Sequence, residues 1–130
     1  MIEELIRLRN DSNLEENKVN SSTFWLVNQD RRLLGVINIR HRLNNNLLEI
    51  GGHIGYGIRP SERKKGYATE LLRLALLEAQ KLGIAKALVT CDKDNIGSAK
   101  AIIKNDGVLD SEAIINGIEI QRYWIEIKNI

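Results

Sequence analysis

Hydrophobic and small residues recur at helical spacing over residues 67–82. They lie at Ala68, Leu71, Leu72, Ala75, Ala79 and Leu82. This pattern predicts an amphipathic helix with a broad apolar face, and Gly83 is a typical end signal. A short apolar run follows at residues 85–91 and predicts a buried strand. Because another predicted strand precedes the helix, the unit predicts a right-handed crossover with two parallel strands side by side.

The upstream half of the chain shows strand patterns with one exception. Residues 2–9 have apolar positions at helical spacing and predict a short helix. Residues 23–27 are rich in β-prone side chains, and residues 33–42 alternate, with the odd-numbered positions favoured for the core. Residues 47–58 are interpreted as one long strand. It contains four glycines, and glycine inside a strand indicates a bulge or a close approach by a ligand.

Downstream, residues 96–105 predict a second helix with Ala99, Ile102 and Ile103 facing inward. Strands at residues 108–115 and 118–127 flank Asn116-Gly117, a strong hairpin signal. The predicted fold is therefore α/β (α+β), a mixed and mostly antiparallel twisted sheet with a central parallel pair and flanking helices.

Composition restricts the classes of function. A chain of 130 residues predicts one domain over residues 1–130, and its formal net charge is only +2. General affinity for nucleic acid or membranes is therefore not indicated. The single cysteine, Cys91, cannot form an internal disulfide, and the first residues do not resemble a signal peptide. Both features favour the cytoplasm.

Candidate chemistry is concentrated in residues 54–70, which are interpreted as a strand end, a basic turn and a helix start. The turn has four basic residues offset by one acid, Glu62. Free N–H groups and the helix dipole favour an anion at such a place. The Walker pattern is absent, and Pro60 stands where a Rossmann fingerprint from Gly55 needs glycine. A solvated basic helix start is the alternative.

Two short motifs resemble a known family. Arg63-Lys-Lys-Gly66-Tyr-Ala68 resembles the Arg/Gln-x-x-Gly-x-Gly/Ala signature of the GNAT family of acetyl-CoA-dependent N-acetyltransferases. Asn95-Ile-Gly-Ser98 resembles the family's Asn-x-x-Ala/Ser helix start, although Asn95 also fits a simple helix cap. The resemblance covers about residues 23–127. The segments 39–44 and 51–63 look like a subgroup known mainly as predicted acetyltransferases.

The resemblance implies a seat for acetyl-CoA. The basic turn would bind the pyrophosphate, the helix start at residue 95 would hold the pantetheine arm, and a strand bulge would polarise the thioester carbonyl. The positions implied are Tyr56, Gly57, Ile58, Arg63, Lys64, Lys65, Gly66, Tyr67, Ala68, Thr69, Asn95 and Ser98. No metal is implied.

The general acid and base are not fixed by the resemblance. The family often has a tyrosine, placed to protonate the thiolate, where this chain has Ile102. Tyr123 is a candidate replacement, and Glu49 and His53 are candidate bases on the predicted strand. Each has a structural alternative. His53 could be a polar residue satisfied within the sheet, Glu49 a solvent-facing residue, and Tyr123 a packing residue with a surface hydroxyl.

The function implied is direct transfer of an acetyl group to a small-molecule or peptide amine, with a homodimer compatible with the sequence. A non-catalytic acyl-CoA-binding or oligomerisation module is the alternative. It is motivated by Ile102 and by the roughly 22 residues before the first clear strand, which predict that an opening strand and a helix are missing. A nucleic-acid module is disfavoured, because the basic turn has Tyr67 as its single interleaved aromatic.

Overall fold

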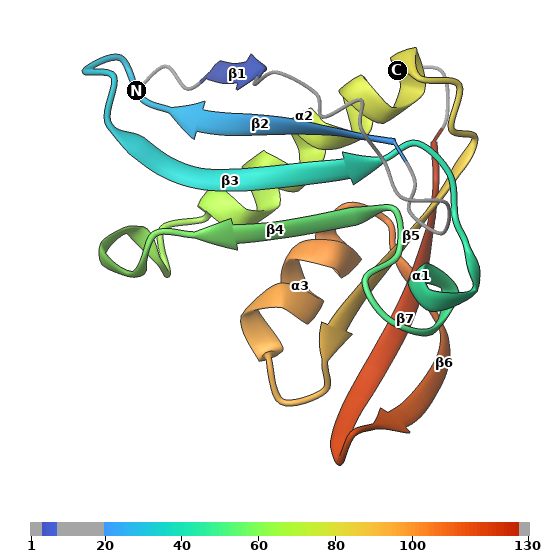
Figure 1. Ribbon diagram of the computed structural model, residues 1–130. Coiled ribbons are helices and arrows are strands. Elements are labelled where there is room, and N and C mark those ends of the chain that lie inside the picture. The colour runs from blue at the N-terminus through green and yellow to red at the C-terminus, as the bar shows by residue number, and fades with distance from the viewer. Residues whose placement is uncertain (1–3, 8–19, 128–130) are drawn as a thin grey trace.

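The computed structural model describes residues 4–7 and 20–127. The described residues form a seven-stranded sheet in the order β1-β2-β3-β4-β5-β7-β6, with three α-helices and one 3-10 helix (Figure 1). The strands are β1 (Glu4–Arg7), β2 (Ser21–Val27), β3 (Leu33–Arg40), β4 (Ile54–Ile58), β5 (Lys86–Asp92), β6 (Val108–Ile115) and β7 (Ile118–Glu126). The helices are α1 (Asn45–Glu49), η1 (Pro60–Glu62), α2 (Tyr67–Lys81) and α3 (Ile96–Lys104).

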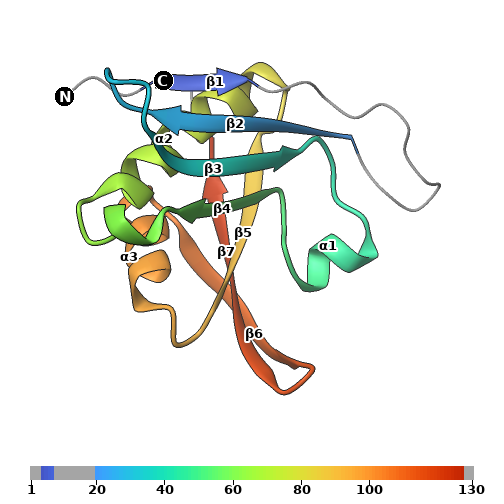
Figure 2. The same cartoon turned by 60° about the vertical axis from the view of Figure 1, so that its left-hand side comes forward.

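The predicted fold class is confirmed. β4 and β5 pair in parallel, and the other neighbouring strands of the described sheet pair antiparallel. The crossover between the parallel strands is α2, as predicted. Turned by 60°, the molecule shows α2 and α3 on one face of the sheet and α1 on the other (Figure 2).

The core lies between α2 and the sheet face that it covers. Buried residues of the sheet include Ile37, Ile39, Ile54 and Val89. The predicted apolar face of the helix is confirmed in Leu71, Leu72, Ala75 and Ala79, all inaccessible to solvent. Burying the apolar stripe of a 15-residue helix against a sheet contributes much more than helix propensity does. α2 is therefore fixed in place over β3 and β4.

The predicted hairpin at the end of the chain is also confirmed. Asn116 and Gly117 both have positive φ, 52° and 80°, which is the backbone that a type I′ turn requires. Asparagine and glycine tolerate this conformation best. β6 and β7 consequently pair from Ile115 opposite Ile118 back to Val108 opposite Trp124.

The helix predicted over residues 2–9 is wrong in its described part. Residues 4–7 form β1, in which Leu5 pairs with Leu26 and Ile6 with Trp25 of β2. Helical spacing over eight residues is a weak signal, and pairing with a strand overrides it. An opening strand is therefore present as β1, against the expectation that it is missing. The expected absence of a helix concerns residues 8–19, which lie outside the described residues. Residues 8 and 9 lie outside the described residues.

The long strand predicted over residues 47–58 is also wrong. Residues 45–49 form α1, whose first turn is capped by the Asn44 side chain accepting from the Leu47 amide at 2.9 Å. Gly51 and Gly52 follow with positive φ, a backbone conformation that a strand does not have. A Cβ at Gly52 would overlap the Leu88 carbonyl oxygen of β5, so glycine is required there. β4 begins only at Ile54.

The inward face predicted for the second helix is confirmed at Ala99 and Ile102 and wrong at Ile103. Ile102 is fully buried and Ala99 packs against the core, but Ile103 is 56% exposed and Ala101 is buried instead. The inner row runs through Ala101, Ile102 and Asn105, whose side-chain amide donates to the Thr69 carbonyl at 3.1 Å. That polar contact joins the C-cap of α3 to the first turn of α2.

Candidate active site at the divergence of β4 and β5

The parallel strands β4 and β5 pair at a single position, Ile54 opposite Val89, and then separate (Figure 1). On its other side β4 is paired with β3 along its whole length. The His53 carbonyl accepts from Arg40, and the Arg59 amide donates to Leu34. Because an antiparallel ladder alternates, the amides of even-numbered β4 residues point away from β3. Those of Tyr56 and Ile58 therefore face the gap.

The start of the divergence is held by a short contact between the turn before β4 and the middle of β5. The His53 amide donates to the Leu88 carbonyl at 2.7 Å, and the Leu88 amide donates to Nδ1 of His53 at 2.9 Å. The Gly51 amide donates to Oγ1 of Thr90 at 2.9 Å. A side chain here takes the place of regular ladder bonds. These hydrogen bonds fix the position along β5 at which the gap begins.

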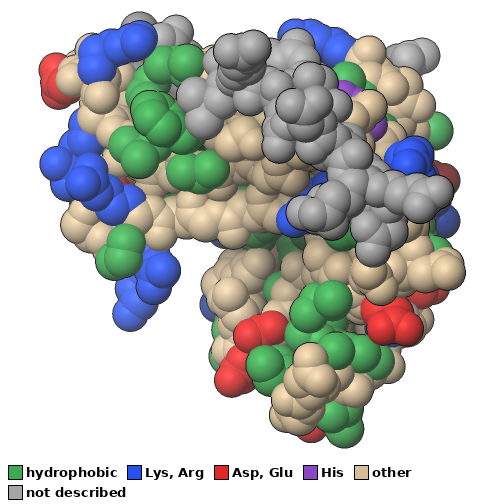
Figure 3. Space-filling model, viewed as in Figure 1, with side chains coloured by type: hydrophobic (Ala, Val, Ile, Leu, Met, Phe, Trp, Pro, Cys, Tyr) green, Lys and Arg blue, Asp and Glu red, His purple; other side chains and the backbone are tan. Residues whose placement is uncertain are grey.

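The basic turn connects the gap to the start of α2. Gly66 occupies the N-cap of α2 with φ of 84°, and a Cβ there would meet nothing within 4 Å. The first helical amides, at Tyr67, Ala68 and Thr69, have no acceptor within a regular helix. Lys and Arg side chains gather around this turn at the left edge of the molecule (Figure 3). The predicted residues 63–69 thus form one positively charged helix start, in which residues 63–66 are exposed and residues 67–69 half-buried.

The cations of this turn are not equivalent. Glu62 is buried, and its carboxylate binds Nζ of Lys65 at 2.8 Å and Nε of Arg32 at 3.0 Å. The hydrogen bond from Lys65, followed by that from Arg32, lowers the pKa of Glu62, so this carboxylate stays ionised. Arg63 donates through Nε to the Ile58 carbonyl. Lys64 is exposed, with φ of 64°.

Glu62 and Arg32 were missed as functional residues from the sequence. The single acid in a basic turn was the available signal, but Arg32 comes from the turn between β2 and β3, thirty residues earlier. Nothing local in the sequence pairs these two positions. Glu62 attaches the basic turn to the sheet and compensates part of its charge.

The start of α3 lies across the gap from β4. The Asn95 side chain accepts from the Ser98 amide at 3.1 Å, so the capping interpretation is confirmed. The Tyr56 hydroxyl lies 2.7 Å from Oγ of Ser98. Burial raises the pKa of Tyr56, with the Ser98 hydrogen bond acting in the opposite direction. Tyr56, Asn95 and Ser98 are therefore brought together, as the prediction of a shared site requires.

The three candidate catalytic residues are not brought together. Glu49 ends α1 rather than lying on a strand, and its carbonyl accepts from Nε of Arg122 at 2.9 Å. His53 precedes β4, and its ring meets Trp124 edge-on with centroids 6.5 Å apart. Tyr123 packs in the core under the helices and donates to Oε1 of Gln121 at 3.0 Å. Glu49 and His53 therefore lie on the opposite sheet face from Tyr123.

The environments of these residues limit what they can do. The alternative interpretation of His53 matches its geometry, since the Nδ1 lone pair already accepts from the Leu88 amide. Burial also lowers the pKa of His53, which keeps the ring neutral. Glu49 is exposed. Burial raises the pKa of Tyr123, whose hydroxyl is hydrogen-bonded inside the protein rather than placed at the surface.

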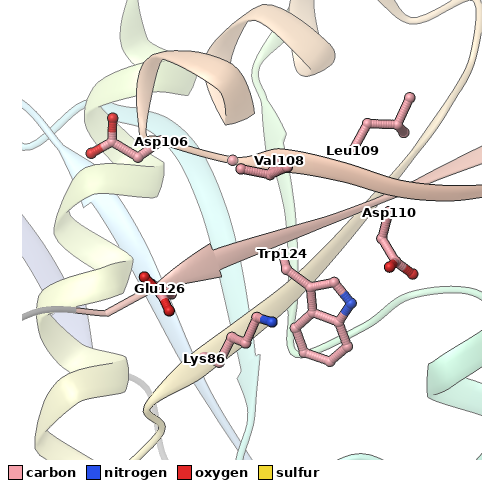
Figure 4. Close-up of a pocket in the computed structure, with 8 residues that line it drawn as sticks. Lys86, Asp106, Val108, Leu109, Asp110, Trp124 and Glu126 are labelled. Atoms are coloured by element: carbon pink, nitrogen blue, oxygen red, sulfur yellow. The ribbon is translucent and has the colours of Figure 1, made fainter.

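A cavity of about 670 Å³ lies elsewhere, near the first residues of β5 and β6 and the last of β7 (Figure 4). Its lining includes Asp106, Asp110 and Glu126, and Nζ of Lys86 lies 5.2 Å from the centroid of the Trp124 ring. Lys86 is at the opposite end of β5 from the gap, so this cavity is separate from the basic turn.

In the described ranges 4–7 and 20–127 we find no group of three or more His, Cys, Asp or Glu side chains that could hold a metal ion. No helix among those residues is long and apolar enough to cross a membrane.

The sequence model of one protein family, the acetyltransferase (GNAT) domain, matches residues 2–108. The chain therefore belongs to the GNAT acetyltransferase family. Among solved structures, it resembles spermidine N-acetyltransferase from Vibrio cholerae in complex with CoA and spermine, with a TM-score of 0.69 and 18% identity. That match covers 82% of this chain and 66% of the other. A chimera of Vibrio cholerae SpeG and hSSAT gives a TM-score of 0.68 at 18% identity, covering 82% and 67%. No curated protein matches.

Proposed function

We propose that this protein transfers an acetyl group from acetyl-CoA to an amine, with both substrates held in one site and the amine attacking directly. The observation that carries the proposal is the gap between β4 and β5, which opens after one paired position and leads to the N-terminus of α2. Similar structures include a CoA and spermine complex and a dodecamer, which supports an amine acceptor and assembly into oligomers. The chain spans 64–67% of the length of these structures.

The residues present fit coenzyme A. Gly66 leaves space at the helix start, because a Cβ there would meet nothing within 4 Å. The amides of residues 67–69, with Arg63 and Lys64, would hold the pyrophosphate. Lys65 would contribute less, because Glu62 already compensates its charge. Asn95 and Ser98 would flank the pantetheine arm. When bound, the cofactor supplies an acetyl group activated as a thioester.

The strand beside the gap would position the reacting carbonyl. The amides of Tyr56 and Ile58 face the gap, where an oxyanion-hole donor must lie. For proton return to the thiolate we keep Tyr123 and add Tyr56, whose hydroxyl already shares a hydrogen bond with Ser98. Glu49 remains a candidate base acting through water. His53 would have to release the Leu88 amide to accept a proton, so it is the weaker candidate.

A calorimetric titration with acetyl-CoA tests the cofactor site. We expect saturable binding that is weakened by Arg63→Ala with Lys64→Ala and unchanged by Lys81→Ala, which removes a lysine from the far end of α2. A folded sample that binds nothing at millimolar ligand would refute the proposal. Release of free thiol in the presence of an amine panel then tests transfer.

The second candidate is a non-catalytic acyl-CoA-binding or oligomerisation module. It is favoured by Ile102, a fully buried aliphatic residue where the family often has its tyrosine. Binding of acetyl-CoA without thiol release across the panel would support this module over the enzyme. For the location, the unpaired and buried Cys91 fits a reducing compartment such as the cytoplasm.

A further inference from the structure

The sheet face opposite α2 and α3 presents two arginines on either side of the parallel pair. Ile37, Ile39 and Tyr56 pack against the helices. Because side chains alternate along a strand, Arg40 of β3 points to the opposite face, and Gly55 and Gly57 of β4 are also at positions of that face. α1 and the turn after it lie on this same face (Figure 2). In the proposed function, α2 and α3 hold the cofactor, which leaves this opposite face for the acceptor.

Arg40 lies directly beside the strand that borders the gap. Its backbone amide donates to the His53 carbonyl, and Nη1 donates to the Gly51 carbonyl at 3.2 Å. The guanidinium covers Gly55, since a Cβ there would lie 2.8 Å from Nη1 and 3.3 Å from Cζ. Gly55 immediately precedes Tyr56, the first residue whose amide faces the gap. A full positive charge therefore lies one residue from the proposed thioester position.

Arg122 of β7 occupies the equivalent place on the other side of the parallel pair β4 and β5. It pairs with Thr90 of β5, one position beyond the Val89 that meets β4. Its Nε donates to the Glu49 carbonyl at 2.9 Å and Nη1 donates to Oγ of Ser111 at 3.3 Å. The two arginines thus bind carbonyls that are two residues apart in one turn. The two guanidinium groups therefore bind the same turn, which precedes the point where β4 and β5 separate.

Neither guanidinium is neutralised within the part of the chain that the structure describes. Both donate to main-chain carbonyls, Arg122 also to a hydroxyl, and neither has a carboxylate partner there. Arg40 is also half-buried, so its charge is weakly screened. A planar guanidinium with free donors suits a carboxylate or phosphate. A guanidinium has five N–H donors, of which these contacts use one in Arg40 and two in Arg122, so each arginine has donors left with which to bind an anion.

We propose that Arg40 and Arg122 form an anion site for the acceptor, so that the acceptor is an amine that also carries a carboxylate or phosphate group. This inference rests on the proposed acetyl transfer. It separates the chain from its polyamine-binding structural neighbours, because two positive charges at the acceptor face disfavour a polycation such as spermidine. The same charges lower the pKa of an approaching amine, which helps to generate the neutral nucleophile without a dedicated base.

The test compares acceptors that share one aminoethyl group. Phosphoethanolamine carries a phosphate, β-alanine a carboxylate and ethanolamine a neutral hydroxyl, and spermidine is the polycation control. We expect kcat/KM for at least one anionic acceptor to exceed that for ethanolamine by about ten-fold or more, the effect of one charge-assisted hydrogen bond. Which anionic acceptor is preferred distinguishes phosphate from carboxylate. Equal or better use of ethanolamine or spermidine would overturn the proposal.

The variants are Arg40→Gln, Arg40→Lys and Arg122→Gln, with Arg42→Gln as an exposed arginine two residues further along the same chain segment. The ratio between anionic and neutral acceptors should fall toward one in the glutamine variants and stay unchanged in the Arg42 control. A purely structural role of Arg40 would lower activity on every acceptor equally and leave the ratio unchanged, which refutes the proposal. Acetyl-CoA affinity, measured in each variant, reports folding.

A binding experiment decides the matter if no panel member is acetylated. Phosphoethanolamine is titrated against the wild-type protein with and without CoA, followed by calorimetry. We expect saturable binding in the wild type and its loss in Arg40→Gln. No binding of phosphoethanolamine or β-alanine to the wild type would overturn the anion site. Failure of CoA itself to bind would instead refute the proposed function, because the anion titration does not depend on it.

Discussion

Replacing Gly52 by alanine tests whether a close backbone approach fixes the gap. Gly52 has φ of 62°, and a Cβ there would overlap the Leu88 carbonyl oxygen of β5. The left-handed backbone alone costs a non-glycine residue about 1–2 kcal/mol. Relief of the overlap moves the Leu88 carbonyl, which accepts from the His53 amide, and each hydrogen bond lost costs about 0.5–1.5 kcal/mol. We expect a total loss of about 2.5 kcal/mol from the free energy of unfolding.

Gly83→Ala is the matched control. Gly83 has φ of 82°, but a Cβ there would meet nothing within 4 Å, so it carries the backbone cost without the overlap. For a chain of this length, about 2.5 kcal/mol corresponds to a fall in Tm of about 9 °C, and the backbone cost alone, about 1.5 kcal/mol, to about 5 °C. Thermal unfolding followed by circular dichroism measures both, and the acetyl-CoA affinity of Gly52→Ala should also fall. Equal Tm values for the two variants would refute the reasoning.

Three further changes have defined outcomes. Tyr56→Phe should cost about 0.5–1.5 kcal/mol, and a double-mutant cycle with Ser98→Ala should show coupling of similar size; additive effects would contradict the 2.7 Å bond. Burial lowers the pKa of His53 in the folded state, so below the unfolded pKa of about 6.5 the unfolded chain binds more protons than the folded protein. The stability of the wild type should therefore fall as pH drops through and below that value. The urea midpoint of His53→Gln should fall less over the same pH range, and parallel curves for the two proteins would contradict this prediction. Glu62→Gln should steepen the salt dependence of acetyl-CoA binding, because Lys65 loses its carboxylate partner and can bind the phosphates instead. Titrations at two salt concentrations measure this slope, and an unchanged slope would show that Lys65 was already available in the wild type.

The sequence by itself determined the elements whose signals are local. Residues 67–82 carry an apolar stripe long enough to specify a helix, and Asn116-Gly117 specifies a turn because both residues accept positive φ. The basic turn and the Asn95 helix start were also found from short motifs, since consecutive residues build them. These features sufficed for the fold class and for the cofactor seat as a hypothesis.

Only the tertiary structure decided the features that depend on distant contacts. Residues 47–58 divide into α1 and β4 because Gly52 packs against Leu88, 36 positions later, and residues 4–7 form a strand because β2 offers an edge. Which side chains meet also depends on the fold. Glu62 pairs with Arg32, the His53 ring accepts from the Leu88 amide, and Arg40 of β3 and Arg122 of β7 bind carbonyls of the same turn. Hydrophobic periodicity specifies which face of an element is buried, whereas the partner of a polar side chain depends on the register and order of strands that no single segment contains.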